Sequence, residues 1–393
     1  MINRLLIVLT AVAALAGTAA AVEKTPFVIG YLEIEGDPRY APPRAYAGID
    51  VRPRHRPVDG AALSIRESKI IGRALGLTFS LDRVSADTAD GLSREMDRLQ
   101  DQRGVDFFIV DGASDVLTSL ADHAADRDML LFNISEPDDR LRSDACAANL
   151  MHVIPSRAML ADAMAQFLVA SRWKNILVLK GEFPADTALA QAFQASAKKY
   201  GLKVVDKRDF VLGNDPRERE KNNIALLTAG VDYDAVFIAD SLGQVGRYVP
   251  YQTALPRPVV GSEGLVAGAW NWAWERHGAP QLNQRFERRM GRRMEDRDWA
   301  AWAAVKAIVE AVARTGGSDF SQTAAYLKGP DMILDGYKGA AMSFRSWDNQ
   351  LRQPLLIHTS NAVIERAPLE GFLHSTQYMD TLGYDAPENR CRF

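Results

Sequence analysis

Short apolar runs alternate with amphipathic segments along most of the chain, and this alternation limits the fold more than any other feature. In the first half, strands are predicted at residues 27–32, 77–84, 105–110, 129–134 and 151–154. Helical patterns lie between them at 61–75, 87–99 and 114–123. Short buried strands separated by helices are typical of parallel sheets covered by helices on both faces.

The second half of the chain repeats the alternation. Strands are predicted at 175–180, 203–211, 233–239 and 259–261. Helices are predicted at about 156–170, 187–200, 218–227, 281–290 and 298–314. Strands without helices follow at 342–344, 355–359 and 362–364, and residues 368–393 read as an irregular tail. The pattern therefore predicts an α/β fold with two doubly wound parallel-sheet lobes joined by a hinge.

The first residues have the pattern of a secretion signal. Arg4 precedes an apolar run over residues 5–16, and small residues occupy 17–21. This order predicts a signal peptide cleaved after Ala21. The apolar run is shorter than the about 20 residues that cross a bilayer, although an uncleaved anchor is the alternative. We expect the protein to be exported.

The charge and cysteine content narrow the function further. With 47 basic and 50 acidic residues, the chain carries a formal charge of −3, so it lacks the basic excess of nucleic-acid binders. In an exported protein the two cysteines, Cys146 and Cys391, favour a disulfide; two buried free thiols are the alternative. A nucleophile elbow, a zinc-binding helix motif, a phosphate loop and a dinucleotide fingerprint are all missing. This absence does not exclude catalysis, and the prediction that the chain is not an enzyme rests on the family resemblance given below.

Four stretches carry a resemblance to a known family: Ile29-Gly30-Tyr31, residues 60–67 (GAALSIRE), residues 260–264 (VGSEG), and 286–290 followed by 299–311. They resemble type I periplasmic binding proteins of the Leu/Ile/Val-binding class. The resemblance implies a periplasmic receptor that closes two lobes on a small ligand and works with the permease and ATPase of an ABC transporter. It also implies chain crossovers between an N-terminal lobe (22–154 and 265–328) and a C-terminal lobe (155–264 and 329–367), followed by the tail.

Three further stretches resemble one subfamily, which is encoded with ABC transporters beside pyrroloquinoline quinone (PQQ)-dependent alcohol dehydrogenases. They are residues 146–160 (CAANLMHVIPSRAML), 371–374 (GFLH) and 388–393 (ENRCRF). This resemblance implies a link to quinoprotein alcohol oxidation and a periplasmic quinoprotein dehydrogenase as a further partner. The alternative function is an accessory protein that delivers a metal or the quinone cofactor to the dehydrogenase, or a sensor.

The family implies a ligand site at the loops that follow the strands. In amino-acid-binding members, first-lobe hydroxyls hold the ligand carboxylate and a second-lobe acid holds the ammonium group. Ser114, Ser135 and Glu263 fit these roles. The remaining expected ligand-binding residues are Asp138, Glu182, Asp240 and Ser262. Acidic side chains at 136, 138 and 139 would repel a carboxylate, which argues against a plain α-amino acid.

Two hypotheses for the ligand follow from the charged loops. The first is a calcium or lanthanide ion, because such hard cations take carboxylate oxygens as ligands. Its expected ligands are Asp111, Glu136 and Asp139, which acids at 33, 35 and 37 could join. EF-hand spacing is missing, and each acid could instead cap a helix and face water. Apart from this ion, no cofactor is expected.

The second hypothesis uses an arginine-rich insert at residues 37–57. It holds arginines at 39, 44, 52, 54 and 56 and tyrosines at 40 and 46. Arginine binds carboxylates with two parallel hydrogen bonds and stacks on aromatic faces, so the insert suits an aromatic polycarboxylate such as the quinone cofactor. The alternative is a solvated loop that docks on the transporter. The tryptophans of 269–274 either stack on a ligand or pack, and we favour packing. His152 is predicted to be structural.

Overall fold

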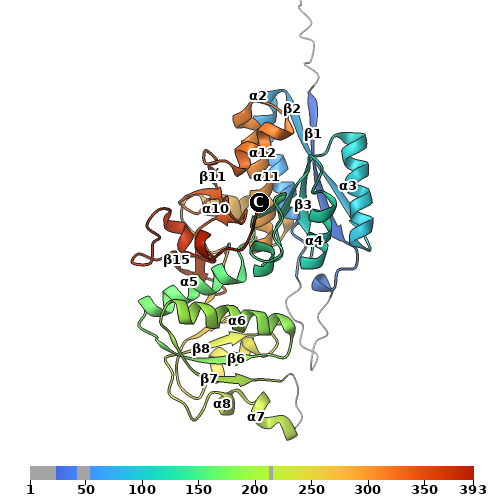
Figure 1. Ribbon diagram of the computed structural model, residues 1–393. Helices are drawn as coiled ribbons and strands as arrows, with labels where there is room; N and C mark the ends of the chain where they lie inside the picture. Colours follow the sequence, from blue (N-terminus) through green and yellow to red (C-terminus); the bar gives the residue numbers. More distant parts are fainter. Residues whose placement is uncertain (1–23, 42–53, 212–215) are drawn as a thin grey trace, which may run out of the picture.

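The computed structural model describes residues 24–41, 54–211 and 216–393, which form two lobes (Figure 1). The predicted signal peptide lies outside these ranges, as does the middle of the arginine-rich insert, with Arg44, Tyr46 and Arg52. Within the described ranges, no helix combines the length and apolar character that crossing a membrane requires.

The first lobe contains a five-stranded parallel sheet with the strand order β2-β1-β3-β4-β5. Its strands are β1 (Thr25–Ile34), β2 (Leu77–Ala86), β3 (Phe107–Asp111), β4 (Leu130–Asn133) and β5 (Leu150–His152). Alternate side chains of β1 face opposite sides of the sheet. Ile29 and Tyr31 enter one core with α1 (Val58–Glu67) and α11 (Asp296–Thr315). Val28 and Leu32 enter another with α3 (Ala89–Arg103) and α4 (Ser114–His123).

The predicted helix over residues 61–75 is divided in two. It consists of α1 and α2 (Lys69–Leu75), which meet at Ser68. The Ser68 hydroxyl donates to the Ser64 carbonyl at 2.7 Å, and side-chain bonds of this kind often bend helices. The structure adds α12 (Phe320–Lys328), which the sequence pattern did not predict. Helix α10 (Ala279–Met290) begins two residues earlier than the predicted helix over 281–290.

The second lobe contains a four-stranded parallel sheet with the strand order β7-β6-β8-β9. Its strands are β6 (Asn175–Lys180), β7 (Lys203–Asp209), β8 (Ala235–Ala239) and β9 (Val259–Gly261). Helices α5 (Arg157–Ala170) and α6 (Pro184–Lys199) cover one face (Figure 1). The predicted helix over 218–227 is two short ones, α7 (Arg219–Asn222) and α8 (Ile224–Leu227), because the Asn223 side chain caps α8. Helix α9 (Val249–Gln252) follows.

A small antiparallel sheet lies between the lobes. It has the order β10-β14-β15, with β10 (Val266–Gly268), β14 (Leu355–His358) and β15 (Val363–Ala367). Leu355 and Ile357 of β14 pack in the second-lobe core, whereas Leu356 packs in the first-lobe core. Side chains of this one strand therefore belong to both cores, as a hinge requires.

The chain crosses between the lobes three times. Two of the crossing segments lie side by side, one near residues 152–154 and one near residue 350. The Gln350 Nε2 donates to the carbonyls of His152 and Ile154 at 3.1 and 3.2 Å. Between α12 and β14 lie the short strands β11 (Leu334–Asp335), β12 (Ala341–Phe344) and β13 (Leu351–Arg352). Met332 and Leu351 pack in the first-lobe core, so that core extends beyond residue 328, where the predicted N-terminal lobe ends.

The C-terminal tail binds both lobes. The Arg345 guanidinium donates to the carbonyl of Leu382 at 2.6 Å, and Asp162 of α5 accepts from the Gly383 N–H at 2.8 Å. At the end of the tail, Cys391 forms the predicted disulfide with Cys146 of the first lobe. The tail has only short 3₁₀ turns at 378–381 and 386–388 in place of longer elements.

Candidate functional site: the cleft between the lobes

The carboxyl ends of strands from both sheets meet between the lobes, where open α/β sheets bind ligands. Asp111 ends β3 and Ser135 follows β4 in the first lobe, and Asp240 follows β8 in the second. Arg54 connects the two edges, because its guanidinium donates to the Ser241 carbonyl. The residues between these edges form the candidate site.

The first-lobe wall is occupied by Arg39 of the insert. Its guanidinium pairs with Asp37 at 2.6 Å and with Asp111 at 3.1 Å. It also donates to the Ser135 hydroxyl at 3.1 Å and to the Gly112 carbonyl at 3.2 Å. The hydroxyl that was predicted to hold a ligand carboxylate therefore already has an arginine as its partner.

Tyr40 completes this network. Its hydroxyl donates to Asp111 Oδ1 at 2.9 Å, and burial together with the Asp111 charge raises the pKa of Tyr40, so the phenol keeps its proton. The guanidinium carbons of Arg39, Arg56 and Arg297 lie 5.6, 4.7 and 5.9 Å from the centre of its ring. Such distances allow cation–π attraction, and the ring therefore gathers three positive charges at the cleft.

The acid near the carboxyl end of β1, Glu33, is neutralised in the same way. Glu33, which is 3% exposed, lies between Arg56 at 3.1 Å and Arg83 at 2.5 Å. Arg56 also donates to the Ile34 carbonyl at 2.8 Å. The described part of the insert therefore folds back onto the strand ends through two arginines, Arg39 and Arg56.

The acids of the loop after β4 have structural partners. Ser114 donates to Asp138 at 2.8 Å. Although burial alone would raise the pKa of Asp138, hydrogen bonds from Arg140 and Ser114 lower it. Glu136 accepts from Arg157 at 3.3 Å. Asp139 accepts from the Ala158 N–H at 2.9 Å near the start of α5, and burial raises its pKa.

The second-lobe residues divide into structural and exposed groups. The buried carboxylate of Asp240 accepts from four backbone N–H groups, those of Leu242, Gly243, Val245 and Gly246, at 2.7–3.2 Å. The Ser262 hydroxyl accepts from the Asp240 N–H at 3.0 Å and donates to the Ile238 carbonyl at 3.1 Å. Both side chains shape the loops, whereas Glu182 is exposed.

A cavity of about 650 Å³ lies at the hinge end of the cleft. Both lobes and the hinge sheet contribute to its lining, with Ser262, Glu263, Trp270, Trp272, Arg293, Glu295, Asp296 and His358 among the residues. The Arg293 guanidinium carbon lies 3.4 Å from the centre of the Trp272 ring. The cavity therefore brings together Ser262 and Glu263, two of the predicted ligand-binding residues, with an arginine stacked on an indole.

The other two tryptophans of the 269–274 stretch are buried. Trp270 stacks on Trp299 with ring centres 6.1 Å apart, and the Trp274 Nε1–H donates to the Tyr337 carbonyl at 3.0 Å. Packing, the role favoured from the sequence, describes these two residues, although Trp270 also contributes to the cavity lining; Trp272 lines the cavity with an arginine over its ring.

Two arginines, Arg54 and Arg297, join Arg39 and Arg56 around Tyr40 on the first-lobe side of the cleft. Burial and the nearby positive charges of Arg297 and Arg39 lower the pKa of Arg54. Among the described residues, no carboxylate makes a hydrogen bond or ion pair with Arg54 or Arg297, whereas Arg39 and Arg56 both have acidic partners. The arrangement can therefore bind an anion without breaking an existing ion pair.

The three acids predicted to bind a metal do not form one ligand set. Asp111 pairs with Arg39, Glu136 with Arg157, and Asp139 with a backbone N–H. In the described ranges, no group of three or more His, Cys, Asp or Glu side chains is placed to hold a metal ion. With these partners the acids do not fit a calcium or lanthanide ion.

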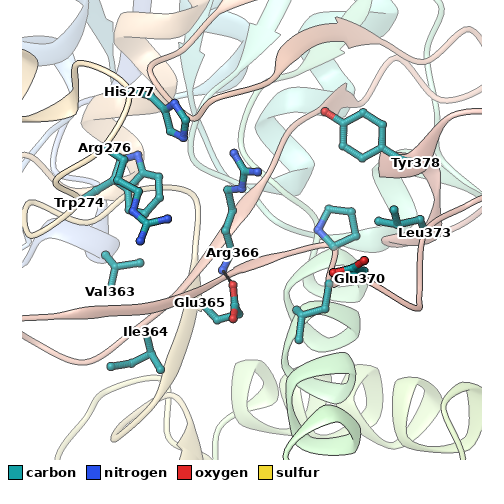
Figure 2. A pocket seen from close by; sticks show the side chains of 12 residues that line it. Trp274, Arg276, His277, Val363, Ile364, Glu365, Arg366, Glu370, Leu373 and Tyr378 are labelled. Atoms are coloured by element: carbon teal, nitrogen blue, oxygen red, sulfur yellow. Dashed lines mark hydrogen bonds between the residues drawn. The ribbon is translucent and has the colours of Figure 1, made fainter.

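A second cavity, of about 760 Å³, lies along β15, and none of the predicted ligand-binding residues is among the described residues that line it (Figure 2). Trp274, His277, Ile364 and Tyr378 contribute to it, with charged side chains of both signs between them. It is separate from the strand ends, so the interlobe cleft remains the candidate site.

The sequence predicts that the insert belongs to the site, but two features of the site were not predicted. The insert's arginines were considered as ligand groups, whereas Arg39 and Arg56 bind the protein's own acids. Arg297, at the start of α11, lies far from the insert in sequence, and no local pattern marks it. Only the packing of α11 beside α1 brings it over Tyr40.

The structure resembles several solved binding proteins at low sequence identity. A branched-chain amino acid ABC transporter periplasmic ligand-binding protein from Burkholderia xenovorans LB400 matches with a TM-score of 0.69 and 15% identity, over 93% of this chain and 98% of the other. An amino acid ABC transporter substrate-binding protein from Pseudomonas fluorescens Pf-5 gives 0.68 and 14%, over 94% and 99%.

A third solved structure is a solute-binding protein of an ABC transporter from Rhodopseudomonas palustris BisB5 in complex with 3,4-dihydroxybenzoic acid. It matches with a TM-score of 0.64 and 14% identity, over 87% of this chain and 97% of the other. No curated protein sequence matches the chain. The similarities confirm the predicted two-lobed fold.

A family model supplies the assignment that these structural similarities cannot make. The model described as periplasmic binding protein matches residues 81–362, which is more than half of the chain and includes parts of both lobes. The chain therefore belongs to the periplasmic binding protein family.

Proposed function

We propose that this chain is the periplasmic solute receptor of an ABC transporter and that it closes its lobes around a planar anionic solute. The observation that carries the proposal is the pair Arg54 and Arg297, which lie near the Tyr40 ring and make no hydrogen bond or ion pair with a carboxylate of the described residues, although the charge of Glu295 acts on Arg54. Arginine side chains bind carboxylates with two hydrogen bonds and stack on planar groups. A flat carboxylate would satisfy both arginines at once.

A plain α-amino acid suits this cleft poorly. The Ser135 hydroxyl, which would hold its carboxylate, accepts from Arg39, and the Ser114 hydroxyl donates to Asp138. To donate to an amino-acid carboxylate, the Ser114 hydroxyl would first have to give up its charge-assisted hydrogen bond to Asp138. The amino acid specificity named for two of the similar structures is therefore not proposed for this chain.

The ligand that we propose is an aromatic polycarboxylate such as the PQQ cofactor, within a system of quinoprotein alcohol oxidation. The subfamily resemblance of residues 146–160, 371–374 and 388–393 supports this neighbourhood. The Rhodopseudomonas palustris protein holds an aromatic acid on a similar fold. The transporter's permease and ATPase are the proposed partners. We propose a binding role and no catalytic one.

A ligand panel tests the proposal. The purified protein would be titrated by calorimetry with PQQ, 3,4-dihydroxybenzoate, leucine, and calcium or lanthanide chloride. We expect binding of a carboxylated aromatic compound and none of leucine. At a concentration of 100 times its Kd, the ligand should also stabilise the fold by about 2.7 kcal/mol. Binding of leucine alone, or of a metal ion alone, would contradict the proposal.

Two variants connect such binding to the cleft. Arg54→Gln and Arg297→Gln should each weaken binding at least about tenfold, because each removes a charge-assisted hydrogen bond to the ligand. Arg94→Gln is the matched control, since Arg94 is an exposed arginine on α3, which covers the other face of the sheet. An unchanged Kd in both cleft variants would exclude this pair from the site.

A further inference from the structure

A second concentration of positive charge lies outside the cleft, on the outer side of the first lobe. A groove of about 700 Å³ between α1 and α10 is lined by Leu63, Arg66, Glu67, Arg285, Arg288 and Arg289. Lys69 and Arg73 of α2 are exposed beside it. We call these six basic residues, together with Ile70, the basic face. The whole chain carries a formal charge of −3, so this charge is local.

The acid within the groove pairs with only one residue of the basic face, Arg285. Glu67 accepts from Arg285 at 2.5 Å and from the Trp302 Nε1–H at 2.9 Å, so both of its oxygens already have partners. Arg66, Lys69, Arg73 and Arg289 form no ion pair with any described residue. Their side chains therefore remain available to a negatively charged partner.

An apolar side chain lies among these charges. Ile70 is 71% exposed, and the spacing of Ile70 and Arg73 places these two side chains next to each other on α2, with Arg66 exposed near the end of α1. Basic side chains around an exposed aliphatic residue are typical of helices that lie on an anionic membrane surface, where the aliphatic group enters the interface.

The position of the basic face also favours a membrane. The Thr25 N–H at the start of β1 donates to the Gly76 carbonyl directly after α2, at 3.0 Å, so the described chain begins beside α2 (Figure 1). The residues before it include the apolar run 5–16, for which the sequence predicts a signal peptide, with an anchor as the alternative. As an anchor, this run would bring the basic face to a membrane, because the described chain begins beside α2.

We propose that the basic face binds the anionic headgroups of a membrane, which would hold the protein on the surface that contains its transporter. Each lysine or arginine near an anionic bilayer strengthens partitioning about fivefold. The contact uses neither the cleft nor its ligand, so it can be tested apart from ligand binding, whereas its role beside a transporter rests on the proposed function.

Vesicle sedimentation tests this proposal on the chain from Val22 onward, in which the apolar segment cannot contribute. Vesicles of phosphatidylcholine with phosphatidylglycerol in a ratio of about 2 to 1 should bind the protein, and pure phosphatidylcholine vesicles should not. Binding should disappear in about 1 M salt, where charges are screened within about 3 Å. Equal binding to both vesicle types, or no binding at low salt, would overturn the proposal and leave an acidic protein as the partner of this face.

Matched variants locate the contact. Arg288→Gln combined with Arg289→Gln should reduce partitioning about thirtyfold, at roughly fivefold for each charge. The control is Arg94→Gln combined with Arg98→Gln on α3, which removes two exposed charges from the opposite side of the sheet. If both double variants lost the same amount of vesicle binding, the binding would depend on net charge alone. The basic face would then not be the surface that binds the membrane. Calorimetry with PQQ on the same variants should give the same Kd as for the wild type, because the basic face lies outside the cleft.

Discussion

At the scale of single residues, polar side chains that look like ligand groups in the sequence often hold the fold together. Asp240 organises its own loop through four N–H groups, and Arg39 binds the acids beside it. Their residue types suit both roles, because a carboxylate or guanidinium binds a protein group as well as a ligand. The residues that remain for a ligand are Arg54 and Arg297, which make no ion pair with a carboxylate of the described residues, although Arg54 donates to the Ser241 carbonyl.

His152 is a buried structural residue, as its sequence context suggested. Its Nε2–H donates to the Leu141 carbonyl at 3.1 Å, which leaves Nδ1 to accept from the Asn133 amide at 3.1 Å. Burial and the nearby Arg142 lower the pKa of His152 well below its ordinary value. The folded protein therefore holds this imidazole neutral at pH values where the unfolded chain binds a proton.

This difference predicts a pH dependence of stability. Below about pH 6.5 the unfolded state binds one more proton than the folded state at this residue, so stability falls as the pH falls. In His152→Gln this contribution is lost. The difference in unfolding free energy between the wild type and the variant should therefore be about 2 kcal/mol smaller at pH 5 than at pH 7.5.

Urea unfolding at several pH values measures this difference. The exposed His277 provides a control, because His277→Gln removes one imidazole while the buried imidazole of His152 stays. If the difference between the wild type and His152→Gln were the same at pH 5 and pH 7.5, His152 would not be the titrating group.

At the scale of elements, the close packing of α1 on α11 fixes part of the cleft wall. Gly60 of α1 lies against the backbone of α11, where a Cβ atom would come within 1.9 Å of the Asp298 carbonyl oxygen. Only glycine permits this approach. The same packing brings Arg297, next to Asp298, over Tyr40 of the insert.

Gly60→Ala is therefore expected to force the two helices apart. Overpacking of this kind costs about 1–3 kcal/mol, and here the obstacle is backbone, which cannot rotate away. Urea unfolding should show a loss in this range or above it, together with weaker binding of the cleft ligand. Gly317→Ala is the control, because a Cβ there meets no atom within 4 Å. Equal stability of the two variants would refute the close-packing argument.

At the scale of the whole molecule, the C-terminal tail joins parts that are distant in sequence. It contacts α5 of the second lobe through Asp162 and ends at the first lobe through the Cys146–Cys391 disulfide. The two cysteines are 245 residues apart, so the crosslink restricts a very large part of the unfolded chain. In the chain-entropy model, a loop of this length stabilises the fold by roughly 5 kcal/mol.

Cys146→Ser combined with Cys391→Ser should therefore lower the unfolding free energy by up to about 5 kcal/mol. The tail at 379–383 should stay in place, because Arg345 and Asp162 still bind it. Guanidinium unfolding gives the first quantity, and limited proteolysis gives the second, with cleavage confined to the last residues. The same midpoint for the wild type and the double variant, both without reductant, would contradict the prediction.

The sequence by itself determined the alternation of strands and helices, the two parallel-sheet lobes and the cysteine pair, because these depend on local apolar periodicity and on composition. Only the tertiary structure decided which charges neutralise one another. Arg39 approaches Asp111, and Arg297 approaches Tyr40, across large separations in sequence. Electrostatic partners are set by distances of a few ångströms, and those distances exist only after α1, α11 and the strand ends have packed together.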